Sequence, residues 1–242
     1  MCPLLRGPRS SGMDSEKEVK LLSLVDILEP LSVEETNRLR QRMPVLRLER
    51  GQTLYTPRYA AGVVFLLLEG RIRLYKVAGG QELTLEVIEV GTMFGEVAFA
   101  ARPQGAYAEA LEPSRVGVVS LDSLGSLVRD RPEVALKIIG LLSERLHLYG
   151  SRMADIGLKE VPARLASLIL RLVESEGIVI GEGHYKIPTR YTHEQLATMI
   201  GAKRVAVTRA FSKFRKIGAL ELDRRYICVR DAGALELAAG GE

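Results

Sequence analysis

Short hydrophobic runs that alternate with polar residues and are separated by glycine occupy residues 45–120. The clearest runs are VVFLLLEG, RIRLYKV, QELTLEVIEVG and SRVGVVS, and Gly79 with Gly80 marks a hairpin turn. Alternation with a period of two is typical of strands that bury one face. We therefore predict an all-β unit, either a roll or a sandwich.

Two short helical patterns precede this unit. The first, DSEKEVKLLSLVDIL, has Asp14 in the N-cap position. The second, SVEETNRLRQRM, begins at Ser32 with Glu35 in the capping-box position and ends before Pro44. Residues 1–13 are rich in Pro, Gly and Ser without periodicity. We expect this tail to be disordered, with Met13 as an alternative start.

After Pro132 the hydrophobic period becomes that of a helix. Residues at spacings of three and four form one narrow seam, namely Ile139, Leu142, Leu146, Tyr149, Met153 and Ile156. Ile138, Leu141 and Leu148 form a second apolar strip beside it. Since a seam of this spacing packs on another helix, we expect a parallel homodimer, with the second strip packed on the β unit. A helix buried wholly within one chain is the alternative.

The sequence after this helix predicts a helix-turn-helix. Gly157 is expected to interrupt the long helix as a hinge, and VPARLASLILRLVES then starts a new one. Thr192 can cap HEQLATMI with Gln195 in the capping-box position, Gly201 makes the turn, and AKRVAVTRAFSKFRK follows as far as Gly218. The expected core positions are Leu196, Ala197, Ile200, Val207, Ala210 and Phe214. LELDRRYICV alternates around a charged tip, as a wing does.

The charge is distributed unevenly. Residues 186–230 hold eleven Lys and Arg against three acids, a net of +8 in a chain of net +4, so the rest carries about −4. A basic block on an otherwise acidic chain is the electrostatic pattern of a polyanion-binding protein.

The second helix of the motif carries the side chains that suit base reading. The candidate DNA-contacting residues are Thr192, His193, Lys203, Arg204, Val205, Thr208, Arg209, Lys213, Arg224 and Arg225. In helix-turn-helix docking, the N-terminal half of the second helix enters the major groove. Arginine can bond both guanine O6 and N7, and Val205 can touch a thymine methyl. We expect Lys213 and the wing arginines to hold phosphates.

Together these features resemble the Crp/Fnr superfamily of transcription regulators. FGE in the β unit, the long dimer helix, VPARLASLILRL and YTHEQLATMIGAKRVAVTRAF carry the resemblance over residues 20–236. It implies an α+β fold with an N-terminal β-roll (jelly-roll-like) sensor domain of the cyclic-nucleotide-binding type, a long dimerisation helix and a C-terminal winged helix-turn-helix domain. Arg204 and Arg209 align with the family's base-reading arginines. Val205 replaces the usual glutamate, which is similar to cyanobacterial nitrogen-control regulators.

The sensor residues depart from that family's pattern. Members that bind cyclic AMP follow Phe-Gly-Glu with an Arg-Ser or Arg-Thr pair that holds the cyclic phosphate; here Glu96 is present, but Gln104 and Gly105 stand in place of the pair. Losing a charge-assisted hydrogen bond costs about 1.5–3 kcal/mol, at least tenfold in affinity. Arg102 is an alternative counter-charge if the loop shifts.

By the same resemblance, the positions that meet adenine are Tyr149 and Gly150. Tyrosine can fill the space that the base would need, and glycine offers no side-chain donor. We therefore expect a degenerate effector pocket, no cofactor, and regulation that is independent of cyclic AMP or tuned to another ligand.

Other chemistries have little support. His147, His184 and His193 are scattered over separate elements, and the two cysteines form neither a CxxC pair nor a metal-ligand cluster, so we expect no metal site. Cys228 lies in an apolar strand pattern, where a buried inert thiol is more common than a redox switch. No catalytic set can be assembled, and no stretch reaches the roughly 20 apolar residues of a membrane span. We expect a cytoplasmic protein that is not an enzyme.

The predicted organisation has four parts: a disordered tail at 1–13, a cyclic-nucleotide-binding-like β-roll with short N-terminal helices at 14–132, a dimerisation helix and hinge at 133–157, and a winged helix-turn-helix domain at 158–242. The predicted function is a sequence-specific homodimeric transcription regulator, an activator by preference, on near-palindromic double-stranded DNA. RNA polymerase is a partner implied by the resemblance. One alternative is a ligand-binding module whose basic C-terminal domain docks an acidic protein; another is a regulator gated by a different small molecule.

Overall fold

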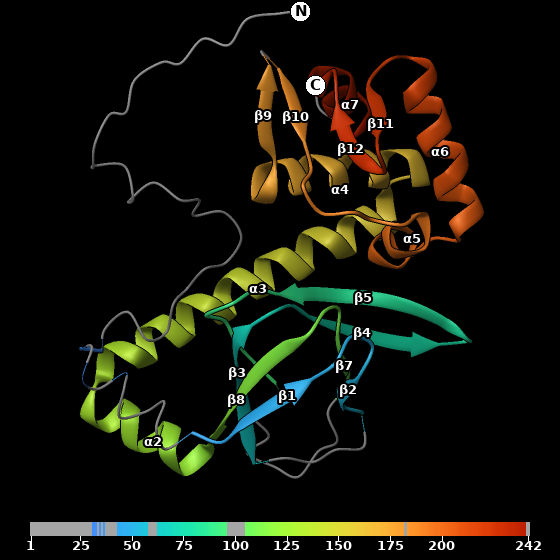
Figure 1. Cartoon of the computed structure of the whole chain (residues 1–242). Helices are drawn as coiled ribbons and strands as arrows, with labels where there is room; N and C mark the ends of the chain where they lie inside the picture. The colour runs from blue at the N-terminus through green and yellow to red at the C-terminus, as the bar shows by residue number, and fades with distance from the viewer. Residues whose placement is uncertain are drawn as a thin grey trace, which may run out of the picture.

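The computed structural model describes residues 31, 32, 34, 36, 43–57, 62–95, 105–181 and 183–240. A β-roll lies along one long helix, α3 (Pro132–Leu158), and a mostly helical domain follows the C-terminal end of that helix (Figure 1). The predicted tail at 1–13 and the predicted helix at 14–28 lie outside the described residues, as does most of the helix predicted from Ser32.

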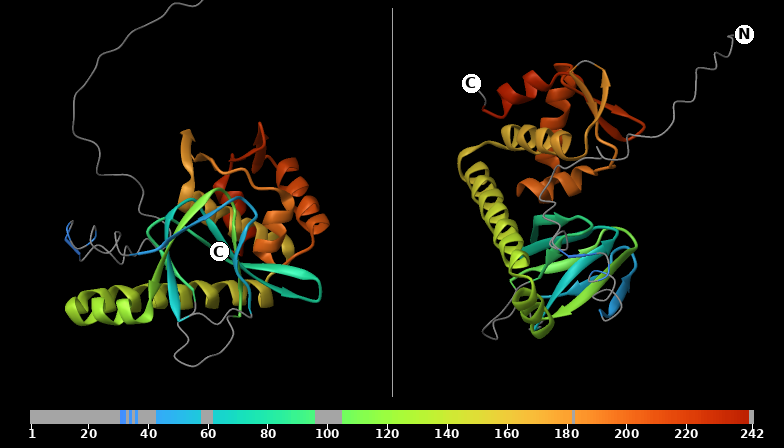
Figure 2. Two further views of the ribbon diagram at one scale, coloured as in Figure 1. Left: turned by 60° about the horizontal axis from the view of Figure 1, so that its bottom comes forward. Right: turned by 90° about the vertical axis from the view of Figure 1, so that its left-hand side faces the viewer.

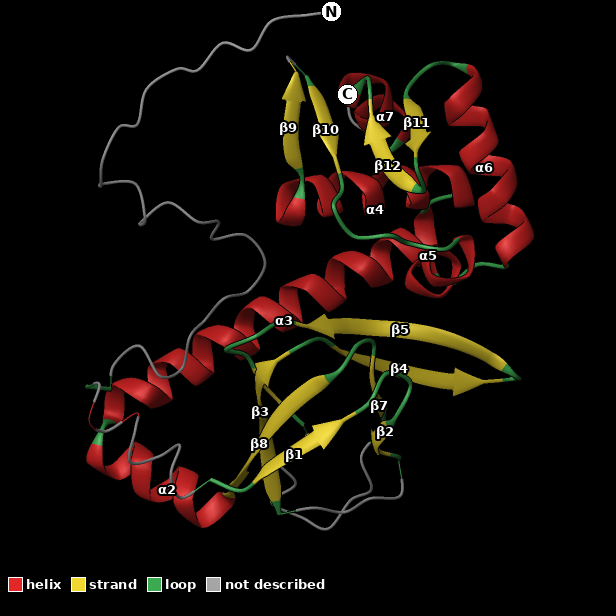
Figure 3. Cartoon of the chain, viewed as in Figure 1, coloured by secondary structure: helices red, strands yellow, loops and turns green. Residues whose placement is uncertain are grey.

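The β-roll consists of two antiparallel sheets, which confirms the predicted all-β unit. One sheet has the strand order β1-β8-β3-β6 and the other has the order β2-β7-β4-β5. The strands are β1 (Val45–Leu48), β2 (Thr53–Tyr55), β3 (Val63–Glu69), β4 (Ile72–Ala78), β5 (Gln81–Ile88), β6 (Met93–Phe94), β7 (Tyr107–Ala110) and β8 (Ser114–Ser120). Figure 3 shows the two sheets on the same side of α3.

The core of the roll forms between the inward faces of these sheets. Tyr55 stacks on Phe65 with ring centroids 5.5 Å apart, and Phe65 contacts Phe94 at the same distance. The hairpin between β4 and β5 turns at Gly79 and Gly80, whose φ angles of +57° and +73° suit glycine. Because this hairpin is long, it extends beyond the roll toward the helical domain (Figure 1).

A helix that the hydrophobic pattern did not predict follows β8. Helix α2 (Leu121–Asp130) begins at Ser120, whose side chain accepts a 3.1 Å hydrogen bond from the backbone N–H of Ser123. Its sequence, LDSLGSLVRD, contains two serines and a glycine, which lower helix propensity. Tertiary packing compensates, since Leu121 and Leu124 lie against the apolar cluster beneath α3.

Helix α3 has the two apolar strips that the sequence predicted. Leu141 is buried against the roll and Ile138 packs beside it. The six seam residues are exposed in the single chain, from 37% at Tyr149 to 75% at Leu146, and Leu136 extends the seam by one turn. The predicted break before the next helix falls one residue later than expected: α3 continues through Gly157 and ends at Leu158, where Lys159 takes an extended backbone conformation.

The C-terminal domain is a helical layer covered by a small sheet. Its elements are α4 (Val161–Glu176), β9 (Ile178–Gly181), β10 (His184–Lys186), α5 (His193–Ile200), α6 (Arg204–Lys216), β11 (Leu220–Asp223), β12 (Tyr226–Val229) and α7 (Ala232–Ala238). The strand order is β11-β12-β10-β9, so the wing predicted at 220–229 pairs with a hairpin that the sequence analysis missed. Figure 2 shows this domain beyond one end of α3, above the β-roll in its right-hand view.

Candidate nucleic-acid interface

Helices α5 and α6 form the predicted helix-turn-helix, and local sequence fixes its geometry. Thr192 Oγ1 accepts from the backbone N–H of Gln195 at 3.1 Å, and Gln195 Oε1 accepts from the backbone N–H of Thr192 at 2.8 Å. This capping box starts α5. Gly201 ends it with φ of +61°, a left-handed conformation that redirects the chain into α6.

The buried side of this motif is the one predicted. Leu196, Ala197, Val207 and Phe214 are each at most 1% exposed, and Ile200 and Ala210 are buried with them. They share one core with α4 and the wing strands. Since interior side chains pack tightly, α6 has one fixed orientation, and the residues between its buried positions are turned outward.

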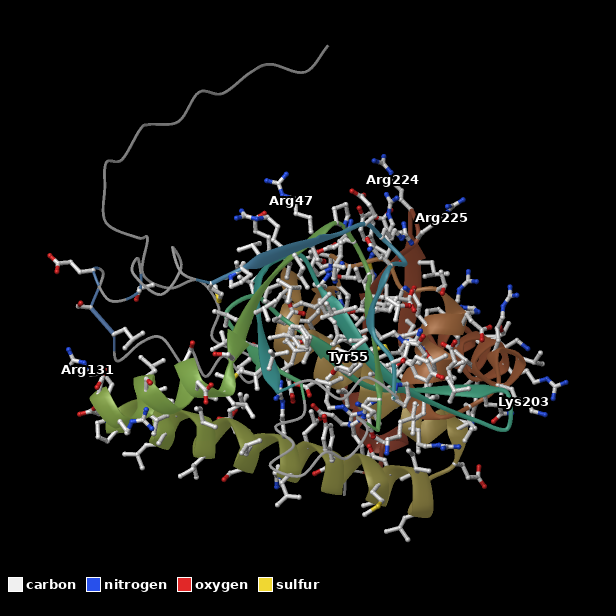
Figure 4. All side chains as sticks on the ribbon, turned by 90° about the horizontal axis from the view of Figure 1, so that it is seen from below. Arg47, Tyr55, Arg131, Lys203, Arg224 and Arg225 are labelled. Atoms are coloured by element: carbon white, nitrogen blue, oxygen red, sulfur yellow. The ribbon has the colours of Figure 1, made fainter. Side chains whose placement is uncertain are left out.

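The outward side of α6 carries the predicted base-reading residues. Lys203, Arg204, Thr208 and Arg209 are exposed, and Val205 is 61% exposed. The helix has no acidic residue in its first turn. Figure 4 shows Lys203 projecting from the edge of the molecule. An exposed helix of this kind presents hydrogen-bond donors and one apolar group to a partner.

The basic residues of this domain fall into two groups. Lys186 forms a 3.0 Å ion pair with Asp223, and Arg230 pairs with Glu221 at 2.9 Å. Other cations form no ion pair with any residue that the structure describes: Lys203, Arg204, Arg209, Lys213, Arg215, Lys216, Arg224 and Arg225. The acids of the wing are therefore compensated, while the cations of α6 and the wing tip remain available for a polyanion.

Two residues of the candidate set contact each other. His193 Nδ1 lies 2.9 Å from Thr208 Oγ1, and the Thr208 hydroxyl also donates to the carbonyl of Arg204 at 3.0 Å. Partial burial, aided by the charge of Arg204, lowers the pKa of His193 below its usual value. A neutral His193 therefore links the start of α5 to the exposed side of α6.

The wing tip is a tight turn that exposes two arginines. Arg224 and Arg225 have φ angles of +48° and +74°, the left-handed values that a two-residue hairpin of this type requires. Both side chains point away from the body of the protein (Figure 4). Lys186 and Arg190 lie over the ring of Tyr226 at 4.6 and 4.7 Å from its centroid, which supports the base of the hairpin.

The predicted effector residues are only partly described. Glu96 and Gln104 lie outside the described residues, and Gly105 is exposed two residues before β7. The Tyr149 hydroxyl donates to Glu86 Oε2 at 2.9 Å, and Arg145 Nε donates to Oε1 of the same carboxylate at 3.1 Å. Burial and this carboxylate raise the pKa of Tyr149 above its usual value. Gly150, the next residue, is exposed.

No cluster of three or more His, Cys, Asp or Glu residues suited to a metal occurs in the described part of the chain. Cys228 is buried in β12, as its strand pattern predicted. None of the described helices has the length and apolar character needed to cross a bilayer.

Known families match both halves of the chain. The family model of the cyclic nucleotide-binding domain matches residues 45–131, and that of the Crp-like helix-turn-helix domain matches residues 163–238. The chain belongs to the Crp/Fnr superfamily. As a Crp/Fnr protein it is a transcription regulator with a DNA-binding helix-turn-helix, and this family consists of regulators and not of enzymes.

Two similar proteins are named as global regulators. A CRP-like cAMP-activated global transcriptional regulator of Mycobacterium tuberculosis is 26% identical over 81% of this chain and 88% of its own length. A global nitrogen regulator of Synechococcus elongatus is 26% identical over 80% and 88%. The structure of a CooA mutant from Carboxydothermus hydrogenoformans covers 92% of this chain and 98% of that chain with a TM-score of 0.79 at 24% identity, which confirms the Crp/Fnr fold.

Proposed function

We propose that this Crp/Fnr protein binds near-palindromic double-stranded DNA as a homodimer, with α6 of each protomer in the major groove. The observation that carries the proposal is the exposed side of α6, where Lys203, Arg204 and Arg209 have no acidic partner among the described residues. Arginine side chains in this position suit guanine edges, and the cations at the wing tip suit the flanking phosphates.

The exposed seam of α3 supports the homodimer. Five of its six predicted residues are aliphatic, and burying each against a second copy contributes about 1.5–3 kcal/mol. A parallel pair of α3 helices would place two copies of α6 on the same side of the dimer, as a two-fold symmetric DNA site requires. The half-site centres are then about 10–10.5 bp apart.

We also propose that the protein acts without cyclic AMP. Its preferred role is that of an activator in the cytoplasm, with RNA polymerase as its partner. One relative is named as cAMP-activated, so this chain's own residues carry the distinction. The hydroxyl of Tyr149, at a position where the family resemblance places adenine, already donates to Glu86. Gly150 beside it supplies no side-chain donor.

Salt titration of a labelled duplex tests the DNA proposal directly. Phosphate contacts release counterions, so the logarithm of affinity should fall steeply and linearly with the logarithm of salt concentration, and a preferred duplex should outcompete a scrambled one. Calorimetry with cyclic AMP tests the second part. Equal affinity for both duplexes would contradict sequence-specific binding, and absence of duplex binding would favour the alternative of docking to an acidic protein.

A further inference from the structure

A cavity of about 490 Å³ lies between the β-roll and the DNA-binding domain, apart from the exposed side of α6. Its walls come from β5 and the turn after it, from α3, from α4, and from the segment that leads into α5. This volume falls in the range of pockets that hold small organic molecules. Since both domains line it, a molecule bound there would contact both at once.

One end of the cavity has an uncompensated carboxylate. Glu89 is half-buried, and its carboxylate makes no hydrogen bond or ion pair with any residue that the structure describes. Burial raises the pKa of Glu89 above its usual value; Arg71 opposes this, and the charges of Glu176 and Glu112 add to it. The Glu89 carboxylate is therefore a hydrogen-bond acceptor at this end of the cavity that lacks a donor or a cation.

The neighbours of Glu89 are already occupied. Arg71 donates to both carboxylate oxygens of Glu112, at 3.3 and 3.1 Å, and to Thr189 Oγ1 at 3.1 Å. Glu176 accepts from the hydroxyl groups of Tyr191, at 2.6 Å, and of Thr189. With Arg71 paired to Glu112, the carboxylates of Glu89 and Glu176 form no ion pair with any cation that the structure describes.

The other end of the cavity is basic. Arg152 donates to the backbone carbonyls of Thr84, Leu85 and Met199, and it forms no ion pair with a described carboxylate. Burial and the charge of Arg171 lower the pKa of Arg152 below its usual value. Arg171 uses one N–H group for Asp155, at 3.1 Å, and makes no other hydrogen bond to the described residues. This end has spare donors and excess positive charge.

The two ends are electrostatically separate. Glu89 interacts with Arg71, Glu112 and Glu176, whereas Arg152 interacts with a different set that includes Glu86, Asp155 and Arg171. Apolar side chains line the space as well, namely Val87, Leu148, Leu168 and Leu172. The cavity thus combines an acidic end, a basic end and apolar walls.

We propose that this cavity binds a small zwitterionic molecule whose amine lies at Glu89 and Glu176, whose carboxylate lies at Arg152 and Arg171, and whose apolar chain contacts the leucines between them. Each charged group of the ligand would then meet opposite charge in a partly desolvated site. Because Glu89 belongs to the β-roll and Glu176 to the DNA-binding domain, the ligand stabilises the arrangement in which the two domains are docked. A ligand shifts such an equilibrium only through its differential affinity for the docked state.

Calorimetry on the full chain without DNA tests the proposal with four probes. 6-Aminohexanoate carries both charged groups at the ends of an apolar chain, 5-aminopentanoate is one methylene shorter, and hexylamine and hexanoate each carry one charge. We expect 6-aminohexanoate or 5-aminopentanoate to bind at least about tenfold more tightly than either singly charged probe, a difference of about 1.4 kcal/mol. Absence of binding by both amino acids at about 10 mM overturns the proposal.

Two variants locate the site. Glu89→Gln should weaken the tighter amino acid about tenfold and leave hexanoate unchanged. Glu49→Gln is the matched control, because the Glu49 side chain is exposed and lies outside the cavity. Hydrogen exchange should slow in residues 84–92 and 188–192 when the amino acid binds. Binding that Glu89→Gln does not weaken, or that leaves exchange in both segments unchanged, contradicts this site. Neither measurement involves DNA, so failure here leaves the proposed function standing.

Discussion

Arg152 Nη2, on the long helix, donates a 2.6 Å hydrogen bond to the backbone carbonyl of Met199, near the end of α5. Arg164 donates to the next carbonyl, that of Ile200, at 3.0 Å. The last carbonyls of a helix lack partners within it, so two arginines complete the C-terminus of α5. The turn at Gly201 and α6 follow directly, so Arg152 on α3 and Arg164 on α4 hold the residues that precede α6.

Arg152→Lys should therefore destabilise the protein. A lysine keeps the charge but lacks the planar fork that reaches three carbonyls, and hydrogen bonds of charged groups contribute about 1.5–3 kcal/mol. We expect a loss of that size in the free energy of unfolding, measured in urea. Arg50→Lys is the control, because Arg50 is exposed. A change within about 0.5 kcal/mol for both variants would show that the contact is dispensable.

Replacing both Leu142 and Leu146 with Glu should produce a monomer that binds a full DNA site weakly. The two leucines are 56% and 75% exposed in the single chain, so the substitution costs little within one protomer but places charges in the proposed helix pair. Sedimentation and DNA titration measure the two effects. Leu237→Glu, at a 71% exposed position on α7, is the matched control and should remain dimeric. Normal dimers of the double variant would mean that the protomers associate elsewhere.

The basic residues should divide by role. Arg204→Ala and Arg209→Ala should each cost about 1–3 kcal/mol of binding and relax preference at particular base pairs. Lys213→Ala and Arg224→Ala should weaken all sequences alike and lower the salt slope by about one. Selection and salt titration of each variant separate the two patterns. Unchanged base preference in Arg204→Ala would refute the assignment of α6 to the groove.

Glu89 should make stability depend on pH. The pKa of Glu89 is raised in the folded state, so folding favours its protonated form. This contribution to the free energy of unfolding is fully present below the usual glutamate pKa of about 4.3, and it is lost as the pH rises through the folded pKa. The charges facing it are Arg71, Glu112 and Glu176. Glu89→Gln should raise the unfolding midpoint at about pH 7 and have little effect at about pH 4. An equal change at both pH values in scanning calorimetry would contradict this account.

The helix-turn-helix could be predicted because its signals are local. The capping box of Thr192 and Gln195, the left-handed Gly201 and the spacing of Val207, Ala210 and Phe214 each fix a neighbouring backbone conformation. The alternating strands and the seam of α3 were equally accessible, since each depends on one period. Such patterns identify helices and strands and show which of their faces are buried, and they do not depend on the contacts between the two domains.

Features that depend on tertiary contacts could not be predicted from the sequence. Helix α2 has weak propensity and is stabilised by packing under α3. The cavity requires Arg71, Glu89 and Arg152, which come from different elements and share no motif. The burial of Thr84 and Glu86 on β5 was not visible in the sequence either, because leucines alternate with them along the strand and Glu86 has its partners, Arg145 and Tyr149, on α3.

Selection from random duplex DNA by the purified protein, with and without millimolar cyclic AMP, tests the central claim most directly. We predict one enriched, near-palindromic site with half-site centres about 10–10.5 bp apart, bound by a dimer, at the same affinity in both conditions. Failure to enrich any sequence, or enrichment of a site without two-fold symmetry, would contradict the proposal that the protein binds specific DNA as a homodimer. A gain of about tenfold or more in affinity with cyclic AMP would contradict the proposed independence from that nucleotide.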